Sequence, residues 1–520
     1  MSPSDADSND SARNSAALPW LVSGSGPRIA RLYQLALAWV LLAAWISLGV
    51  QIHVLIGSRG LLPIAPLAER IRDIGGRAWL QFPSWLALDP SDAALTAGVV
   101  VGVMLALLVL WGVVPRLCLF LSAPLFLGYA VAGQDFTAFQ WDHLLVESCI
   151  LAACLPRRRP APVAHTLMRL LLFKIYFESG IAKAQSYLGD WVDGSAMRFY
   201  YETAPLPAWP GWYTHHLPEA WHTVESWGAL GLEFGGAFLI LGSRRARLFA
   251  LVAFTAFQIL NLATANYGYF VYLTLALHLF LLDDGDLERV SRRLGAWLPF
   301  RWLPWNSPRP LKTFPLPLPA ALRNAVFSLF VAAWLVVSLA VGIVHFTRPG
   351  SPPELVQIIE SETRSFRIAN AYHLFGHITR ERVEPEFQTR VNGVWQSHPL
   401  HYKPGDPEQR PAWVAPHQPR VDFLLWFYGL NHRRPAPAYV TALLQQMCTD
   451  PDAVQSLFAN PLPASPDAVR IEFWRHHFTS PEQRRQSGAW WTREAVGRLR
   501  ALECTDVRRR DVKRAPGSRS

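Results

Sequence analysis

The sequence contains little charge for its length. Only 17% of its 520 residues are Asp, Glu, Lys or Arg, whereas soluble chains average roughly 25%. Several uncharged stretches reach roughly 20 residues, the length that an α-helix needs to cross a bilayer. The last 170 or so residues, in contrast, have the composition of an ordinary soluble domain. These features exclude a wholly soluble protein and predict a membrane part followed by a water-soluble part.

Motifs of several enzyme classes are absent. The chain has no glycine-rich phosphate loop, no G-x-S-x-G nucleophile elbow and no Cys-x-x-Cys; these absences argue against a nucleotide-binding enzyme, a lipase with its own triad and a dithiol oxidoreductase. The adjacent pairs His215-His216 and His476-His477 place their rings on different sides of a helix or strand, which disfavours a shared metal ion. We therefore predict no metal, no other cofactor and no catalytic residue.

Lysine is scarce, although the net charge is +10. The five lysines stand against 44 arginines, a ratio that hints at a GC-rich bacterial source. The arginines occur in short clusters between apolar runs rather than on one soluble domain, so the charge does not indicate nucleic-acid binding. Such clusters are typical of the cytoplasmic flanks of membrane spans.

Hydropathy predicts about nine transmembrane helices within residues 30–348. The expected spans are 32–56, 94–114, 117–133, 139–155, 165–184, 224–241, 246–265, 267–282 and 322–346. Residues 1–29 are polar and are expected to form a disordered cytoplasmic N-terminus. Because no cleavage site follows the first apolar run, that run is expected to remain as a signal anchor.

The positions of the basic residues predict the orientation. They cluster before the first span, at Arg116, at 157–159, at 244–247 and throughout 283–323. In a nine-span chain all five places lie on one side, which the positive-inside rule identifies as the cytoplasm. The odd-numbered loops and residues 349–520 would then lie in the periplasm or lumen, in a bacterial inner membrane or an endoplasmic reticulum membrane respectively.

Residues 349–520 are predicted to form a small α+β extramembrane domain. The residues Asn392-Gly393 join two loosely alternating segments, 383–391 and 394–402, and are a strong hairpin signal. Residues 424–428, 439–447 and 490–502 are interpreted as helical. Cys448 and Cys504 both fall in this domain, where a disulfide could form or could be forbidden by geometry.

Charged residues in the predicted spans require partners or a function, because charge inside a bilayer is costly. The predicted intramembrane cluster comprises Asp142, His143, Glu147, Lys174, Glu178, Lys183 and Glu233. Lys174 and Glu178 are spaced i, i+4. Lys183 is expected level with Asp142 and is interpreted as a structural cation paired with it. Ion pairs that join helices are the simplest interpretation; a ligand-binding or proton-handling cavity and misplaced spans are the alternatives.

Several strings resemble the lipase maturation factor family over roughly residues 30–430. They are residues 139–147 (FQWDHLLVE), 172–180 (LFKIYFESG), 200–207 (YYETAPLP), 212–218 (WYTHHLP), 261–270 (NLATANYGYF), 366–376 (FRIANAYHLFG), 379–382 (TRER), 402–406 (YKPGD) and 416–422 (PHQPRVD). His143 and His373 depart from the family pattern. A fainter similarity links 176–197 to the membrane segment of vitamin K-dependent carboxylases, in which the lysine corresponding to Lys183 would act as a base.

The main resemblance implies a non-enzymatic, chaperone-like membrane protein that assists the maturation of exported clients such as lipases. Its partners would be the lipid bilayer and the client. The alternative is a membrane enzyme of the carboxylase-like type that uses the buried Asp/His/Glu/Lys cluster, and a transporter is a third possibility. The matched loops are aromatic-rich and are predicted to face the client side, although an aromatic belt that anchors helices would look similar. The candidate client-binding residues are Tyr200, Tyr201, Glu202, Trp212, His215, His216, Asn266, Tyr267, Asn370, Tyr372, Glu381, Arg382, His417, Arg420 and Asp422.

Overall fold

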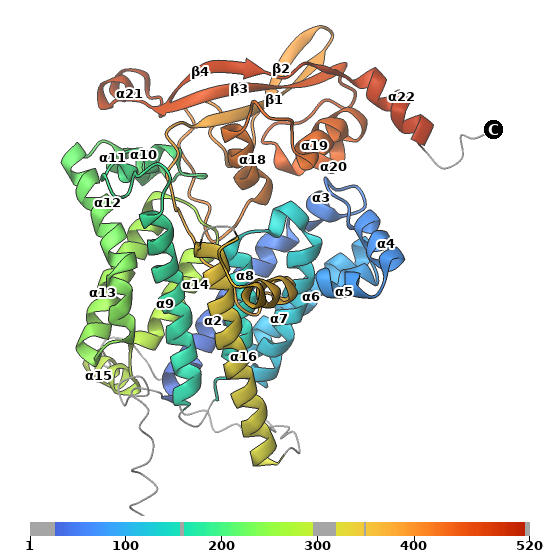
Figure 1. The fold of residues 1–520 in the computed structure, drawn as a ribbon. Coiled ribbons are helices and arrows are strands. Elements are labelled where there is room, and N and C mark those ends of the chain that lie inside the picture. Colours follow the sequence, from blue (N-terminus) through green and yellow to red (C-terminus); the bar gives the residue numbers. More distant parts are fainter. Residues whose placement is uncertain (1–25, 157–160, 295–318, 348–349, 515–520) are drawn as a thin grey trace, which may run out of the picture.

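The computed structural model describes residues 26–156, 161–294, 319–347 and 350–514. Most of the N-terminus that was expected to be disordered and the arginine cluster at 157–159 lie outside the described residues. The described part consists of a bundle of upright helices and an antiparallel sheet at one end of the bundle (Figure 1).

Within the residues that the structure describes, six helical stretches are long and apolar enough to cross a membrane. They are α2 (Pro27–Gly49), α6 (Asp92–Trp111), α7 (Pro115–Ala132), Glu219–Leu241 (α12, Glu219–Phe234, with a short 3₁₀ turn), α13 (Arg244–Thr264) and Ala321–Phe346 within α16 (Ala320–Phe346). All six coincide with predicted spans. The multi-span helical membrane class predicted from hydropathy is therefore confirmed.

The other three predicted spans coincide with α8 (Gln140–Ala153), α9 (Pro162–Ala184) and α14 (Phe270–Leu277). These helices are shorter or more polar than the six. Eleven of the 14 residues of α8 are buried, so this helix faces other helices rather than lipid and can carry polar side chains. At Gly180, a Cβ atom would lie 2.5 Å from the backbone nitrogen of Phe234, so glycine allows α9 to approach α12 closely.

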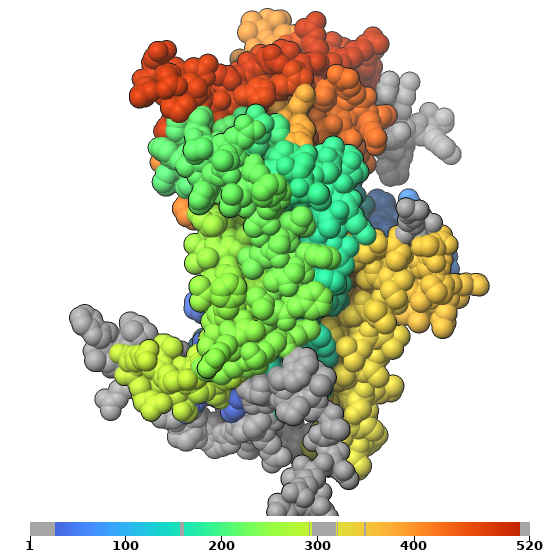
Figure 2. Space-filling model, turned by 60° about the vertical axis from the view of Figure 1, so that its left-hand side comes forward, coloured from blue at the N-terminus to red at the C-terminus, as the bar shows by residue number. Residues whose placement is uncertain are grey.

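Short helices connect or flank these elements. They are α3 (Ile52–Ile56), α4 (Ile64–Ile74), α5 (Arg77–Gln81), α10 (Ala196–Thr203), α11 (Trp209–His215), α15 (Asp284–Leu294), α17 (Glu354–Thr363), α20 (Pro451–Val454), α21 (Pro481–Ser487) and α22 (Cys504–Arg514). Helices α10 and α11 lie at the end of the bundle that carries the sheet, and α15 lies at the opposite end (Figure 1). In the space-filling view, α16 lies along the side of the bundle (Figure 2).

The sheet has the strand order β2-β1-β3-β4, with β5 also paired to β3. Its strands are β1 (Val383–Val391), β2 (Val394–His398), β3 (Ala468–Phe478), β4 (Trp491–Arg498) and β5 (Leu502–Glu503). The predicted hairpin at Asn392-Gly393 joins β1 to β2, and its second strand ends at His398 rather than at residue 402. The predicted helices at 424–428 and 439–447 lie within α18 (Arg420–Leu430) and α19 (Ala438–Thr449), so the α+β class is confirmed.

The interpretation of residues 490–502 as helical is wrong, because the chain there forms β4 and β5. The local sequence, with its Arg, Glu, Ala and Leu residues, has helix propensity, but pairing with β3 overrides it. Trp491 is buried opposite Phe478, and a register shift next to Trp474 hides the simple alternation of a strand.

Basic residues gather at the end of the bundle that is remote from the sheet. Arg28 pairs with Glu288, 2.5 Å apart, and Arg247 pairs with Asp283 at 3.2 Å. The carboxylate of Asp284 accepts hydrogen bonds from the backbone amides at the start of α2. The arginine clusters on which the predicted orientation depends, as far as the structure describes them, thus lie at one end of the molecule (Figure 1).

Candidate functional site

Two segments that precede and follow the first hairpin, residues 367–382 and 412–420, reach into the end of the helical bundle. We call the region where they contact the helices the junction. At its centre Glu147 of α8 accepts hydrogen bonds from the Tyr372 hydroxyl at 2.7 Å and from the side chain of Asn370 at 2.9 Å. Its other oxygen accepts from the Trp334 indole at 3.1 Å and lies 3.5 Å from the Lys174 ammonium. One carboxylate thereby joins α8, α9, α16 and the segment 367–382.

Lys174 and Glu178 lie one turn apart in the second half of α9. The carboxylate of Glu178 accepts a hydrogen bond from the Tyr372 amide at 2.8 Å. The Lys174 ammonium donates to the Ser338 hydroxyl at 3.2 Å and lies over the Trp334 ring. Lys174 thus lies between helices. Its ammonium pairs with Glu147 rather than with Glu178, its neighbour one turn along α9.

Lys183 pairs with Glu233 of α12 at 2.5 Å. It also donates to the backbone carbonyl of Leu374 at 2.8 Å and lies 5.0 Å from the centre of the Trp191 ring. The expectation that Lys183 pairs with Asp142 is therefore wrong. Because its ammonium is buried and fully engaged, nothing here supports the carboxylase-like role of this lysine.

The partner of Asp142 is Arg420, which lies at the start of α18. The guanidinium donates two hydrogen bonds to the carboxylate, at 2.7 and 2.9 Å, and a third to the Phe136 carbonyl at 2.7 Å. The Tyr269 hydroxyl donates to the same carboxylate at 2.5 Å. Asp142 and Arg420 are 0% and 1% exposed, so this bidentate pair is sequestered from solvent.

The segment 412–420 is held mainly through its backbone. Asn266 accepts hydrogen bonds from the amides of Val414 at 2.7 Å and Ala415 at 3.0 Å, and it donates to the Ala412 carbonyl at 2.8 Å. The Ser47 hydroxyl of α2 accepts from the Gln418 amide at 2.9 Å. Gln51, which lies between α2 and α3, also donates to the Gln418 carbonyl at 2.8 Å, so three polar side chains from two helical regions fix a stretch that has little regular secondary structure.

A further cluster lies between α10 and β3. Glu202 accepts hydrogen bonds from the Phe478 amide at 2.8 Å and from the His477 ring at 3.0 Å. Burial opposes ionisation of Glu202, but these two hydrogen bonds hold its pKa below the usual value. The hydrogen bond to Glu202 raises the pKa of His477. Arg382 donates to the Glu202 carbonyl at 2.6 Å and pairs with Glu384.

Most of the candidate client-binding side chains are buried in or beside the junction. The buried ones are Tyr200, Tyr201, Glu202, Trp212, Asn266, Tyr267, Asn370, Tyr372, Arg382, Arg420 and Asp422. His215, His216 and His417 are half-buried, and Glu381 is exposed. The Tyr200 and Tyr267 hydroxyls hydrogen-bond at 2.7 Å, and burial raises the pKa of Asp422 to about 7. This burial argues against direct client contact by these side chains in the conformation described, so such contact stays a prediction.

Two residues of α16 that the sequence did not single out also contribute to the junction. Trp334 and Ser338 bring α16 onto the charged cluster. Their i, i+4 spacing on an apolar helix places both on one face, and this spacing is the sequence signal that could have identified them.

His143, another of the predicted intramembrane residues, is buried at 9% exposure. Its backbone carbonyl accepts a long, 3.5 Å hydrogen bond from Asn370.

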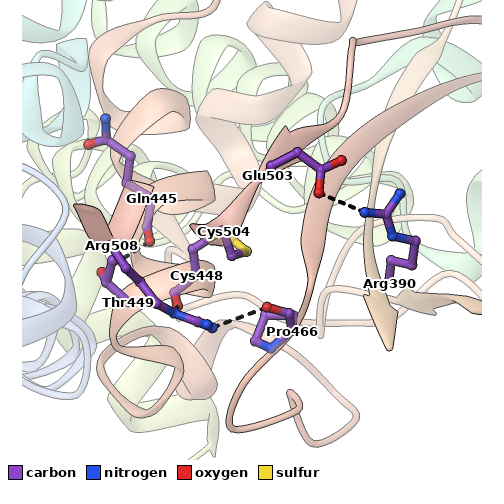
Figure 3. Close-up of a disulfide and its surroundings, with 8 residues drawn as sticks. All are labelled: Arg390, Gln445, Cys448, Thr449, Pro466, Glu503, Cys504 and Arg508. Atoms are coloured by element: carbon purple, nitrogen blue, oxygen red, sulfur yellow. Dashed lines mark hydrogen bonds and ion pairs between the residues drawn. A yellow bond between two sulfur atoms is a disulfide. The ribbon is translucent and has the colours of Figure 1, made fainter. Parts of the chain in front are cut away.

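The disulfide that the sequence left open is present in the structure. Cys448 of α19 and Cys504 of α22 are bonded, with a sequence separation of 56 residues (Figure 3). Arg508 donates to the Cys448 carbonyl at 3.0 Å and to the Pro466 carbonyl at 3.1 Å. The bridge and this arginine together fasten α22 to α19. Among the described residues, no group of three or more His, Cys, Asp and Glu side chains could hold a metal ion.

Two family models match this chain. The lipase maturation factor transmembrane domain matches residues 28–289, and the lipase maturation factor C-terminal domain matches residues 368–501. The chain belongs to the lipase maturation factor family. The resemblance inferred from the strings is thus confirmed, and both segments of the junction overlap the matched C-terminal domain.

Curated relatives are similar over nearly the whole chain. Lipase maturation factor 1 of Mus musculus is 26% identical over 499 residues, covering 89% of this chain and 84% of the relative. Lipase maturation factor 2 of Gallus gallus is 27% identical over 587 residues, covering 91% and 81%. Lipase maturation factor 1 of Homo sapiens is 27% identical over 508 residues, covering 89% and 85%. No solved structure matches this chain.

Proposed function

We propose that this protein is a non-enzymatic, membrane-embedded maturation factor that assists the folding of exported client proteins, lipases among them. The observation that carries the proposal is the family membership, with relatives named lipase maturation factors along more than 80% of their length. The geometry agrees, because the polar side chains of the junction are engaged with one another in ion pairs and hydrogen bonds. Such an arrangement holds two parts of a protein together rather than converting a substrate.

We further propose that residues 30–348 form the transmembrane domain and that residues 349–520 form a domain on the non-cytoplasmic side. Two features support this orientation. The described arginine clusters lie at the end of the molecule opposite the sheet, as the positive-inside rule requires of a cytoplasmic end. The Cys448–Cys504 bridge lies at the sheet end, and disulfides persist in oxidising compartments.

In this arrangement the helical bundle anchors the C-terminal domain at the membrane surface where exported chains emerge. The ion pairs Asp142–Arg420 and Lys183–Glu233 and the hydrogen bonds of Glu147 fix the junction. A client would then contact the exposed surface of the domain, and the buried family strings would serve to position that surface.

The test is lipase maturation in cells that lack this protein. The measurement is the triglyceride-hydrolysing activity of the exported fraction, divided by the amount of lipase protein, with and without a plasmid that supplies the full chain. The proposal predicts that this specific activity falls several-fold without the protein and returns with it. Unchanged specific activity in the deletion strain would contradict the maturation role.

A lysine substitution separates this function from the enzymatic alternative. Lys183→Met removes the ammonium while keeping most of the side-chain volume, so a base-catalysed reaction would be abolished. A maturation factor would instead lose lipase activation only in proportion to the loss of folded protein, measured on the same membranes. Complete loss of activation with the folded protein undiminished would favour the enzyme.

A further inference from the structure

Helix α17 lies beside the last long helix, α16, rather than beyond its end. α16 ends with Phe346 at the sheet end of the bundle, and Figure 1 shows the amber coil of α17 end-on next to the upper part of α16. The chain turns between them at Gly350, whose φ of 81° suits glycine, and α17 packs against α16. Because α16 is long and apolar enough to cross a membrane, α17 lies at the depth where that span reaches the bilayer surface.

α17 is amphipathic, and its apolar side is uncovered. Leu355, Ile358 and Ile359 share one side of the helix by their i, i+3, i+4 spacing, and Glu354 and Gln357 lie on the opposite side. In the described part of the chain, no residue of α17 is buried. Leu355 and Ile358 are 67% and 49% exposed, and Figure 2 shows α17 projecting sideways from the bundle. An isolated helix of this length is marginal in water, so α17 calls for an apolar partner outside the described chain.

A second exposed apolar stretch is the neighbour of α17. It is residues 74–88, the end of the connection between α2 and α6, in which Leu80 and Leu88 are 58% and 69% exposed. Arg77 of α5 pairs with Glu362 near the end of α17, which brings the two stretches together. Figure 1 places α4 and α5 at the side of the bundle, below α19 and α20. The two exposed apolar stretches therefore lie next to each other at the sheet end of the spans.

The lipid bilayer is the partner that this position favours. α17 follows the span in α16, and residues 74–88 precede the span in α6. Only 17% of the most apolar stretch of α16 is buried by the rest of the chain, so lipid covers the helix against which α17 packs. Helices that lie in a membrane surface carry leucine, phenylalanine and tryptophan on one side and polar residues on the other. Residues 74–88 supply Trp79, Leu80 and Phe82 in the same way. A client or a second copy of this chain would have to displace that lipid.

We propose that α17 and residues 74–88 lie in the surface of the bilayer at the sheet end of the bundle, with Leu355 and Ile358 among the acyl chains. This inference goes beyond the proposed function, because it assigns part of residues 349–520 to the membrane and does not depend on which client is served. The segment 367–382 follows α17 closely in the chain. Contact of α17 with lipid therefore fixes the entry of that segment into the junction at the membrane surface.

Collision rates of nitroxide spin labels test the depth of α17. Single cysteines at Ile358 and at Gln357 are spin-labelled in the full chain in lipid nanodiscs, with the three free cysteines replaced by alanine. The two relaxing agents are oxygen, which concentrates in lipid, and a water-soluble nickel chelate. The inference predicts that oxygen dominates at position 358, as expected for a side chain about 5–10 Å inside the membrane surface. The nickel chelate should dominate at position 357.

Two reference positions calibrate the collision rates. Leu329 is an exposed residue within the span of α16, and Gln396 is an exposed residue of β2. If the nickel chelate dominates at position 358 as it does at position 396, α17 lies in water and the inference is overturned. If both agents are excluded from position 358, a protein covers α17 rather than lipid, and the inference is overturned as well.

Hydrogen exchange of the α17 amides provides a second test, which needs no label. Ile358→Glu places a charge on the apolar side of the helix, and Gln357→Glu places the same charge on the polar side as the matched control. If lipid stabilises α17, the amides of residues 354–363 should exchange about tenfold faster in nanodiscs with Ile358→Glu and less than twofold faster with Gln357→Glu. Equal exchange in the two variants would contradict the contact with lipid.

Discussion

The buried charges at the junction find their partners across large distances in the sequence. Asp142 in α8 binds Arg420, 278 residues away, and Glu147 binds Tyr372, 225 residues away. An unpaired charge in such a place would cost several kcal/mol, so the helices and the later segments complete each other. Loss of one partner should therefore weaken the attachment of the C-terminal domain more than a surface substitution would.

Arg420→Ala tests this dependence. Removing the guanidinium leaves the Asp142 carboxylate buried at 0% exposure without its cation. We expect a loss of about 3–5 kcal/mol in stability. The measurements are thermal unfolding in detergent and the rate at which protease releases residues 349–520 from the membrane part.

The matched control is Arg433→Ala, an exposed arginine shortly after α18, which should change stability by less than about 0.5 kcal/mol. Adding Asp142→Asn to Arg420→Ala should restore part of the loss, because the uncompensated charge is then gone. Equal stability of Arg420→Ala and Arg433→Ala would show that the pair does not hold the domain.

The Glu202–His477 pair predicts a pH dependence. His477 has its pKa raised above 6.5, so its contribution is complete below pH 6.5 and is lost as the pH rises through the raised value. Glu202 has its pKa lowered from 4.5, so its contribution is complete above pH 4.5 and is lost at lower pH. His477→Gln should therefore destabilise the protein most between pH 4.5 and 6.5, and least above pH 8.

Because the His477 side chain is 49% exposed, solvent screens the pair and the effect should stay below about 1 kcal/mol. The measurement is the difference in unfolding temperature between variant and parent at pH 5.5 and at pH 8.5. His215, whose pKa is lowered by burial, changes stability with pH in the opposite direction. Because this residue is present in both variant and parent, comparing their unfolding temperatures at each pH removes its contribution. The control His401→Gln, at an exposed site, should show no such trend; a larger loss at pH 8.5 than at pH 5.5 would contradict the assignment.

At this scale the sequence indicated which side chains needed partners but not which partners they have. Because charge in a bilayer is costly, the positions of Asp142, Glu147 and Lys183 within predicted spans identified them as residues that need partners. Their pairing depends on how segments hundreds of residues apart are folded, which local spacing cannot reveal. The expected Lys183–Asp142 pair failed for this reason, since an estimate of depth along two helices does not fix their rotation.

Among the elements, the long apolar helices were the easiest to predict. Twenty uncharged residues admit few structures other than a span, and the hairpin was marked by Asn392-Gly393. Strand β4 was missed because its Arg, Glu and Ala residues favour a helix and because its bulge breaks the alternation. Elements defined by their own composition were thus predictable, whereas elements defined by their neighbours were not.

The link between α19 and α22 gives a prediction at the scale of elements. Replacing both Cys448 and Cys504 by serine opens a loop of 56 residues. The chain-entropy model gives a loss of about 4 kcal/mol for a loop of this length. The variant should unfold at a lower temperature than the parent under non-reducing conditions, and the two should converge in reductant; Cys154→Ser, at a free cysteine, should behave like the parent.

Thiol counting checks the bridge itself. The chain has five cysteines, of which Cys118, Cys149 and Cys154 are free in the structure. After denaturation in maleimide without reductant, three thiols should react, and after reduction five should react. Five reactive thiols without reductant would show that the bridge does not form in the cell.

At the scale of the whole molecule, the described arginine clusters that flank the spans and the disulfide lie at opposite ends. Arg28 and Arg247 lie in ion pairs at one end of the bundle, and the sheet and the disulfide lie at the other. A membrane protein with this polarity is expected to place the arginines that flank its spans in the cytoplasm. The junction then holds the C-terminal domain against the outer end of the helices, where an exported client could reach it.

The orientation of the C-terminal domain is the claim on which the maturation role depends most directly. It is measured by placing single cysteines at Gln396 and at Arg245, both exposed, in a background with Cys118, Cys149 and Cys154 replaced by alanine. Sealed membranes with the outer side exposed are treated with a membrane-impermeant maleimide. The account predicts labelling at position 396 at once and at position 245 only after detergent is added. Labelling at position 245 with position 396 protected would place the sheet in the cytoplasm and contradict the account.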